Sequence, residues 1–105
     1  MVYNVVRTDS FENDYDRILG YLCHVLDSPS AASRLMDEVG HVAEVVERTP
    51  FVRTISSKPY LAVRELREYF ILGYVIIYQV IEDQVAFVRM FHQSQLYDSE
   101  RYWRS

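Results

Sequence analysis

The sequence predicts an α+β domain in which an antiparallel hairpin of two helices packs on one face of a small, mainly antiparallel, twisted sheet. Three observations predict this class. A short strand-like segment opens the chain at residues 2–6, apolar side chains recur every three or four residues between residues 11 and 46, and residues 69–91 are largely apolar. Helical stretches followed by runs of strands are typical of α+β folds. With 105 residues, half of them hydrophobic, residues 1–105 are expected to form one domain.

The first two elements follow from side-chain type and from capping residues. Residues 2–6 (VYNVV) are mostly β-branched or aromatic, which predicts a strand. Residues 8–10 (TDS) offer a helix cap, and apolar positions from Phe11 to Leu26 then recur mostly at spacings of three and four. The helix is expected to end at residues 27–29 (DSP).

A second helix is predicted from Pro29 to the neighbourhood of Thr49, because proline suits a first helical position and an apolar stripe follows it. Ser28 is expected to cap this helix. The short break between the two helices makes them an antiparallel hairpin. Gly20 and Gly40 are expected to let the two helices approach each other closely.

Three strands are predicted after the helices. Residues 61–67 (LAVRELR) alternate weakly and predict an outer strand, whereas residues 69–81 are nearly all apolar and predict a central strand covered on both faces. Residues 82–83 form a tight turn into a last strand, in which residues 86, 88 and 90 share one face and residues 85, 87, 89 and 91 the other. The predicted core includes Leu19, Leu22, Leu35, Val39, Val42, Ile76, Tyr78, Val88 and Met90.

Several features favour a cytoplasmic protein. The sequence holds no apolar run of about 18 residues and no basic-then-apolar leader, so neither membrane insertion nor secretion is expected. Cys23 has no second cysteine to pair with and is expected to be a small core residue in a reducing compartment. Residues 97–105 (YDSERYWRS) predict either a short extra turn or a flexible end.

Charge is distributed unevenly along the chain. Residues 9–48 carry nine acidic and three basic side chains, a net charge of −6, and residues 51–105 carry six acidic and seven basic ones, a net charge of +1. Proteins that bind nucleic acids tightly usually present a basic face. The balance therefore argues against tight, autonomous binding of RNA or DNA.

Candidate catalytic residues gather on or beside the predicted sheet. The three histidines are far apart, the cysteine has no CxxC partner and the three glycines are not clustered, so neither a metal nor a cofactor is expected. Cleavage of RNA through its 2′-OH needs a base, a cation for the phosphate and an acid. These residue types occur in the set Arg64, Glu65, Arg67, Arg89, His92 and Tyr97. Structural roles are the alternative: an ion pair for Arg89, a hydrogen bond to a neighbour for His92, and packing for Tyr97.

The order of elements and several residues resemble the RelE/ParE family of toxins from bacterial type II toxin–antitoxin pairs. Residues 28–32 (SPSAA) resemble the start of the second helix in the ParE branch, and Tyr74 and Tyr78 match the family's central Tyr-x-x-x-Tyr. Arg89 and His92 match its last strand, which commonly ends in a histidine followed by a glycine and two arginines. The resemblance implies a RelE/ParE-like fold and a toxin that arrests growth until a cognate antitoxin protein binds it.

Two positions depart from the family pattern. Val75 stands where many members carry arginine, and residues 93–95 (QSQ) lack the arginines that follow the histidine. In RelE-like members these arginines stabilise the scissile phosphate, and one lost contact of this kind costs about 10²–10³ in rate. The resemblance therefore leaves two targets open, DNA gyrase (ParE-like) and mRNA on the ribosome (RelE-like). For mRNA cleavage the candidates are Arg89, His92 and Tyr97, with Arg64 and Glu65 in weaker support.

The alternative function is that of a non-toxic, catalytically degenerate module, which binds an antitoxin or acts as a regulatory partner. For any antitoxin partner, the outer strand expected at residues 61–67 would offer unpaired backbone groups to a partner strand. The acidic helices favour basic side chains on that partner.

Overall fold

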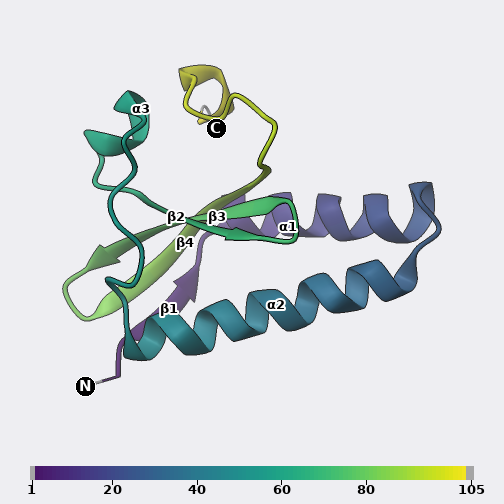
Figure 1. Ribbon diagram of the computed structural model, residues 1–105, viewed down its shortest axis with the longest axis horizontal. Coiled ribbons are helices and arrows are strands. Elements are labelled where there is room, and N and C mark those ends of the chain that lie inside the picture. Colours follow the sequence, from purple (N-terminus) through teal and green to yellow (C-terminus); the bar gives the residue numbers. More distant parts are fainter. Residues whose placement is uncertain (1, 104–105) are drawn as a thin grey trace.

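In the computed structural model, which describes residues 2–103, two long helices cover one face of a four-stranded sheet (Figure 1). Strand β1 leads into the helices, and the other three strands follow them in sequence. The elements are β1 (Asn4–Arg7), α1 (Asp9–Gly20), the π-helical turn η1 (Tyr21–Val25), α2 (Pro29–Arg48), α3 (Pro59–Ala62), β2 (Arg67–Ile71), β3 (Tyr74–Ile81), β4 (Gln84–His92) and the 3₁₀ turn η2 (Glu100–Tyr102). The strand order is β1-β4-β3-β2, with β1 parallel to β4 and the other pairs antiparallel. The predicted α+β class is confirmed.

The two helices begin and end close to the predicted residues. Thr8 caps α1, because its Oγ1 accepts a hydrogen bond of 3.1 Å from the N–H of Phe11. Ser28 caps α2 through its backbone carbonyl and not through its side chain. The expected close approach at Gly20 and Gly40 is wrong, because a Cβ built at either position meets no atom within 4 Å outside its own stretch of helix.

Two strand predictions are wrong in their boundaries. Residues 61–67 are not an outer strand, because the chain forms α3 and a turn there, and the edge strand is β2. Residues 69–81 are not one strand, because the chain reverses at Leu72 and Gly73, whose φ angles are 48° and 83°. Tight hairpin turns of this kind usually hold asparagine or glycine at both central positions. A leucine at the first position extends the apolar run and hides the turn.

The predicted alternation of faces in β4 is wrong because β4 contains a bulge. The pairing shifts between Ile77 and Tyr78 of β3, which leaves Val88 without an opposite residue. An extra residue of this kind interrupts the alternation of side chains along a strand. Val85, Phe87 and Met90 consequently pack in the core beneath the helices, whereas Val88 and Phe91 pack on the opposite face.

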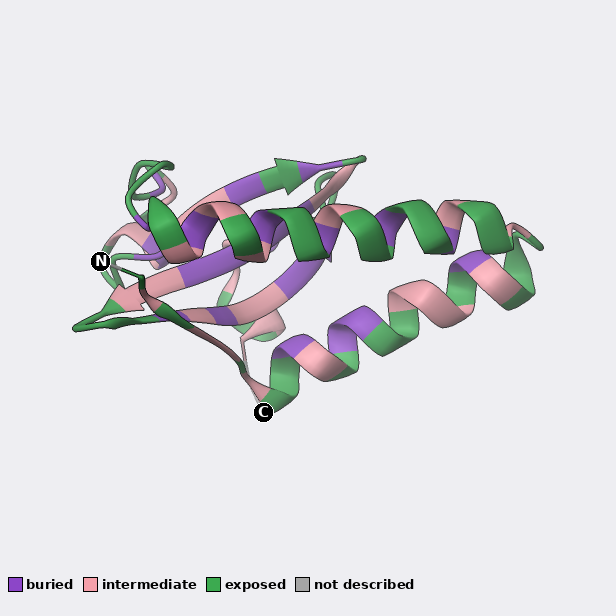
Figure 2. Ribbon diagram, turned by 90° about the horizontal axis from the view of Figure 1, so that it is seen from below, coloured by how far each residue is buried: buried purple, intermediate pink, exposed green. Residues whose placement is uncertain are grey.

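Apolar side chains are buried on both faces of the sheet. The larger core lies between the sheet and helices α1 and α2, whose buried positions recur along each helix (Figure 2). Of the predicted core, Leu22, Leu35, Val39, Val42, Ile76, Tyr78 and Met90 are buried, whereas Leu19 and Val88 are only partly buried. Cys23 is a half-buried free thiol that packs against this core. Among residues 2–103, no helix has the length and apolar character needed to cross a membrane.

The second, smaller core lies on the face opposite the long helices. There α3 and residues 93–103, which we call the C-terminal segment, cover Val75, Ile77 and Phe91 of the sheet. The tail expected from residue 97 onwards therefore forms the extra turn up to Trp103, and residues 104–105 lie outside the described residues.

Candidate functional site

Arg89 lies in β4, and its guanidinium is held by groups from helix α1 and from the C-terminal segment. Its Nε and Nη2 donate to the Asp14 carboxylate over 2.6 Å and 3.1 Å, and its Nη1 donates to the carbonyl oxygen of Tyr102. The side chains of Arg89 and Asp14 are only 16% and 3% exposed. The guanidinium also lies 4.6 Å from the centre of the Phe91 ring. The charge of Arg89 is therefore balanced within the fold.

Asp14 holds this arrangement because β1 is shorter than β4. Where β1 ends, the hydroxyl of Thr8 donates to the Val88 carbonyl over 2.8 Å. Two residues further along β4, Asp14 Oδ2 accepts the backbone N–H of Met90 over 3.0 Å. The carboxylate thus takes the place of the missing strand neighbour and satisfies a buried backbone donor. Arg17, one turn later on α1, donates to its Oδ1 over 3.0 Å.

His92 ends β4 and is exposed. Its Nδ1 accepts the N–H of Ser94 over 3.2 Å and lies 2.6 Å from the Ser94 hydroxyl. The backbone N–H of His92 donates to the Gln95 side chain, and the His92 and Tyr74 rings form a T-shaped pair with a centroid distance of 5.4 Å. A ring nitrogen that accepts a backbone N–H carries no proton, so the neutral imidazole holds its proton on Nε2. His92 is therefore a positioned hydrogen-bond donor.

Tyr97 is buried between aromatic and charged neighbours. Its ring stacks on Phe91 at 5.2 Å with an interplanar angle of 7°, and Lys58 Nζ lies 5.2 Å from the ring centre. Its hydroxyl donates to Glu68 Oε2. Burial raises the pKa of Tyr97 above its ordinary value, and the hydrogen bond to Glu68 raises it further. The phenol consequently stays protonated and acts as a donor.

Glu68 joins three segments into a polar cluster that the sequence did not predict. Burial acts to raise the pKa of Glu68, but hydrogen bonds from Lys58, Ser56 and Tyr97 outweigh it and hold the pKa below its ordinary value. The Lys58 ammonium lies 2.8 Å from the carboxylate. Of the four residues only Tyr97 was singled out, because a loop, an edge strand and the C-terminal segment share no pattern in the sequence.

Arg64 and Glu65 lie in the turn before β2, apart from the other candidates. Arg64 stacks on the Tyr60 ring at 3.6 Å and donates to the Tyr60 carbonyl over 2.7 Å. Glu65 takes a left-handed backbone conformation with φ 55°. Neither lines a hollow that contains His92 or Tyr97. Arg67, at the start of β2, donates to the Arg53 carbonyl over 2.6 Å.

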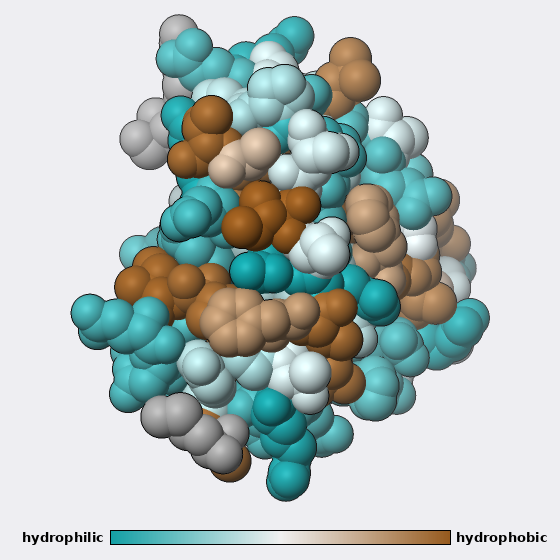
Figure 3. Space-filling view, turned by 60° about the vertical axis from the view of Figure 1, so that its left-hand side comes forward, coloured by the Kyte–Doolittle hydropathy of each residue, from teal (hydrophilic) through white to brown (hydrophobic). Residues whose placement is uncertain are grey.

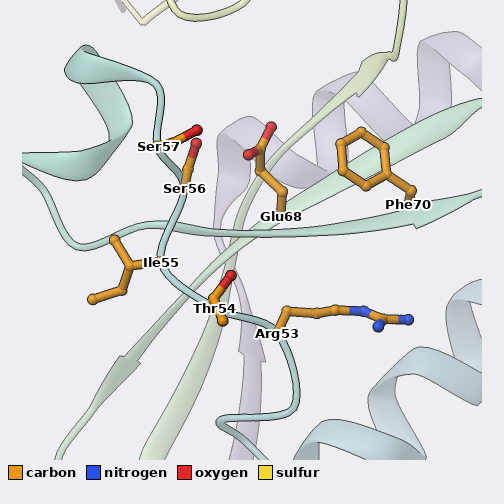
Figure 4. A pocket seen from close by; sticks show the side chains of 7 residues that line it. All are labelled: Arg53, Thr54, Ile55, Ser56, Ser57, Glu68 and Phe70. Carbon is orange, nitrogen blue, oxygen red and sulfur yellow. The ribbon is translucent and has the colours of Figure 1, made fainter.

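One open hollow of about 550 Å³ does bring His92 and Tyr97 together. Its lining comprises Lys58, Phe70 and residues 92–98. A second hollow of about 500 Å³ shares Phe70 with the first and is lined by residues 53–57, Glu68 and Phe70. In Figure 4 the Ser56 and Ser57 hydroxyls lie on the side toward which the Glu68 carboxylate points, and the Arg53 side chain extends away from it.

The surface offers neither a metal centre nor one continuous apolar patch on the face that Figure 3 shows. Hydrophobic side chains on that face lie in separate clusters between hydrophilic ones (Figure 3). Within residues 2–103, no three or more histidine, cysteine, aspartate or glutamate side chains are grouped so that they could hold a metal ion.

Comparison with known proteins assigns the family. The family model described as "ParE toxin of type II toxin-antitoxin system, parDE" matches residues 5–97. Among solved structures, a chain of the "Chromosomal ParDE TA system from P. aeruginosa" is similar, with a TM-score of 0.67 and 14% identity over 87% of this chain and 96% of that one. At that identity the structural likeness bears on the fold alone. No curated protein matches significantly. Because the family model covers most of the chain, this protein belongs to the ParE toxin family of type II toxin–antitoxin systems.

Proposed function

We propose that this chain is the cytoplasmic toxin of a type II toxin–antitoxin pair, that it arrests growth by binding a protein target, and that a cognate antitoxin silences it. The family match over residues 5–97 supports the toxin and the antitoxin partner. DNA gyrase is the target that the resemblance to the ParE branch implies. The observation that favours a protein target over RNA is that the cationic side chains Arg89 and Lys58 of the candidate site are already paired with carboxylates.

Phosphate chemistry needs a cation that is free to meet the charge developing in the transition state. Arg89 is already paired with Asp14, and Lys58 is paired with Glu68. Lys58 is also the one cationic side chain that lines the hollow containing His92 and Tyr97, and Asp98 lines the same hollow. Among the described residues, this hollow therefore holds no uncommitted positive charge for a phosphate.

Ribosome-dependent mRNA cleavage is the second candidate function. The hollow of about 550 Å³ gathers Lys58, His92 and Tyr97, which are residue types able to move protons. Substrate binding would have to release Lys58 from Glu68 before it could meet a phosphate. The non-toxic binding module is the remaining alternative.

We expect the gene of the cognate antitoxin to lie immediately beside the gene of this chain. Expression of this chain from a tightly repressed promoter, without that neighbouring gene, tests these functions together. We expect growth arrest with a DNA-damage response, intact cellular mRNA in primer extension, and inhibition of purified gyrase in a supercoiling assay. His92→Ala should retain the arrest, as should the neighbouring control Gln93→Ala. Cleaved mRNA that becomes intact in His92→Ala would instead establish the ribonuclease. A soluble chain without any effect on growth would leave the non-toxic module.

A further inference from the structure

Two adjoining hollows lie where the long helices meet the end of the sheet, and no function discussed above uses them. Their volumes are about 290 and 280 Å³, and both are lined by Tyr74 and His92. Most of the remaining lining is apolar, contributed mainly by Ile18, Tyr21, Met90, Leu22, Leu35 and Leu72. Concave sites with an apolar lining and a few polar groups are typical binding sites.

The charged groups of these hollows are all positive. Arg17 lines the first hollow and Arg34 the second, and no carboxylate lines either. Residues 9–48 contain nine acidic and only three basic side chains, so two of the three basic ones are at these hollows and none of the nine acidic ones is. The net charge of −6 therefore does not describe this surface.

Both arginines are available to a ligand. Arg34 is exposed and forms no ion pair among residues 2–103. The Arg17 side chain is 67% exposed, and its partner Asp14 also balances Arg89, which leaves positive charge in excess. His92 adds a hydrogen-bond donor, because Ser94 engages its Nδ1 and its Nε2 has no partner among the described residues.

Leu72, at the rim of the second hollow, is an exposed apolar residue whose backbone conformation is strained. Leu72 is 45% exposed and has a φ of 48°, a conformation that side chains other than asparagine and glycine disfavour. Tyr21, on the rim of the first hollow, is 48% exposed. Strained backbone that persists without a structural benefit commonly marks a binding surface.

We infer that these two hollows receive an acidic segment of the antitoxin, with a large apolar side chain seated against Tyr74 and carboxylates on Arg17 and Arg34. The inference rests on the proposed function, because it needs an antitoxin, and it gives that partner a chemistry opposite to the basic one expected from the charge of the helices. A nucleic acid is also anionic, but a mainly apolar lining with two arginines fits a peptide better than a phosphate backbone.

The test measures binding between the purified chain and the purified product of the neighbouring gene. Arg34→Glu should raise the dissociation constant at least about tenfold, because it places a negative charge opposite a carboxylate. Arg48→Glu is the matched control. Arg48 is an exposed arginine on the same helix that lines neither hollow, so its reversal should change binding less than about twofold.

A second variant separates binding from folding. Leu72→Asn keeps the turn and suits its backbone conformation, so the thermal midpoint should rise or stay unchanged. Binding should nevertheless weaken about five- to tenfold, because the apolar contact is lost. A variant that folds at least as well and binds worse cannot owe its defect to misfolding.

Each outcome decides a different statement. Wild-type binding that neither Arg34→Glu nor Leu72→Asn weakens would overturn this inference and leave the proposed function standing. A neighbouring product that does not bind even the wild-type chain would overturn both. A 20-nucleotide single-stranded RNA that competes with the antitoxin, and whose binding is lost in Arg34→Glu, would overturn the peptide as the occupant.

Discussion

At the scale of single residues, Asp14 connects helix α1 to strand β4 through a buried hydrogen-bond network. Its one carboxylate accepts hydrogen bonds from two arginines and from the backbone of Met90, and the side chain is only 3% exposed. A buried charge is tolerated when its partners satisfy all of its hydrogen bonds. Arg89 is consequently a member of this network, whatever further role it has.

Asp14→Ala should lower the free energy of unfolding by about 3–5 kcal/mol, because it leaves Arg89 partly buried without a counter-charge and the Met90 N–H unsatisfied. Urea denaturation followed by circular dichroism measures this. Arg17→Ala is the control, because the Arg17 side chain is 67% exposed and its pair with Asp14 should therefore contribute below about 1 kcal/mol. Equal effects of the two substitutions would show that the pair with Arg89 is no stronger than a surface ion pair.

Glu68 makes stability depend on pH. Its pKa is lowered in the folded chain, so its contribution is fully present above about pH 4.5 and is lost as the pH falls through the lower folded pKa. Tyr97→Phe removes one of three donors, so the folded pKa should rise toward its ordinary value.

The variant should therefore be less stable by about 1–2 kcal/mol at pH 7. Between about pH 5 and about pH 3, where a carboxyl with a pKa below 4.5 takes up its proton, it should lose less stability than the wild type. Urea denaturation at a series of pH values measures both effects. Tyr60→Phe is the control. A Tyr97→Phe variant with an unchanged acid dependence would mean that its hydroxyl does not stabilise the ionised Glu68.

At the scale of elements, the turn between β2 and β3 is the least favourable part of the sheet. Leu72 has a positive φ and precedes Gly73, a pair of positions at which Asn-Gly is strongly preferred. Leu72→Asn should stabilise the isolated chain by about 0.5–1 kcal/mol, because it removes a backbone strain of that order. Thermal and urea unfolding measure this gain, with Leu96→Asn as a control at an exposed leucine outside the strands. A net loss of stability would show that Leu72 contributes more by packing than it costs by strain.

At the scale of the whole molecule, strands β3 and β4 lie between two apolar cores. Their side chains pack beneath the long helices on one face and beneath α3 and the C-terminal segment on the other. Because both cores contain side chains of the same two strands, disruption of one core should unfold these strands and with them the other core. The C-terminal segment is therefore expected to unfold together with the helices.

Trp103, the only tryptophan of the chain, reports on this cooperativity. Its Nε1 donates to the Tyr97 carbonyl over 2.5 Å, and its ring lies 5.7 Å from Phe91. Its fluorescence should change in the same urea transition as the helical circular dichroism. Trp103→Ala should cost about 2 kcal/mol, less than a fully buried tryptophan, because the side chain is only partly buried. An earlier fluorescence transition would show that the C-terminal segment docks independently.

The sequence by itself determined what depends on neighbours along the chain. The helices follow from apolar spacing, the Thr8 cap and the break at residues 27–29, all within one or two helical turns. The same local patterns predicted the α+β class and most of the helix core. The side-chain types and the family resemblance singled out His92 and Tyr97, which line one hollow and whose role in a site stays a prediction. These features could be predicted because helical geometry repeats at a fixed short period.

Only the tertiary structure decided what depends on residues far apart in sequence. Arg89 meets Asp14 across 75 positions, and Glu68 meets Tyr97 across 29. The bulge at Val88 and the apolar turn at Leu72 moved strand boundaries and side-chain faces without any polar residue to mark them. The net charge of the helices could likewise be counted from the sequence. The placement of Arg17 and Arg34 at two hollows without a carboxylate depends instead on how the helices pack on the sheet. Local periodicity can be read from the sequence, but packing decides which distant groups come into contact. It therefore decides which charges are paired inside the fold and which remain available to a ligand.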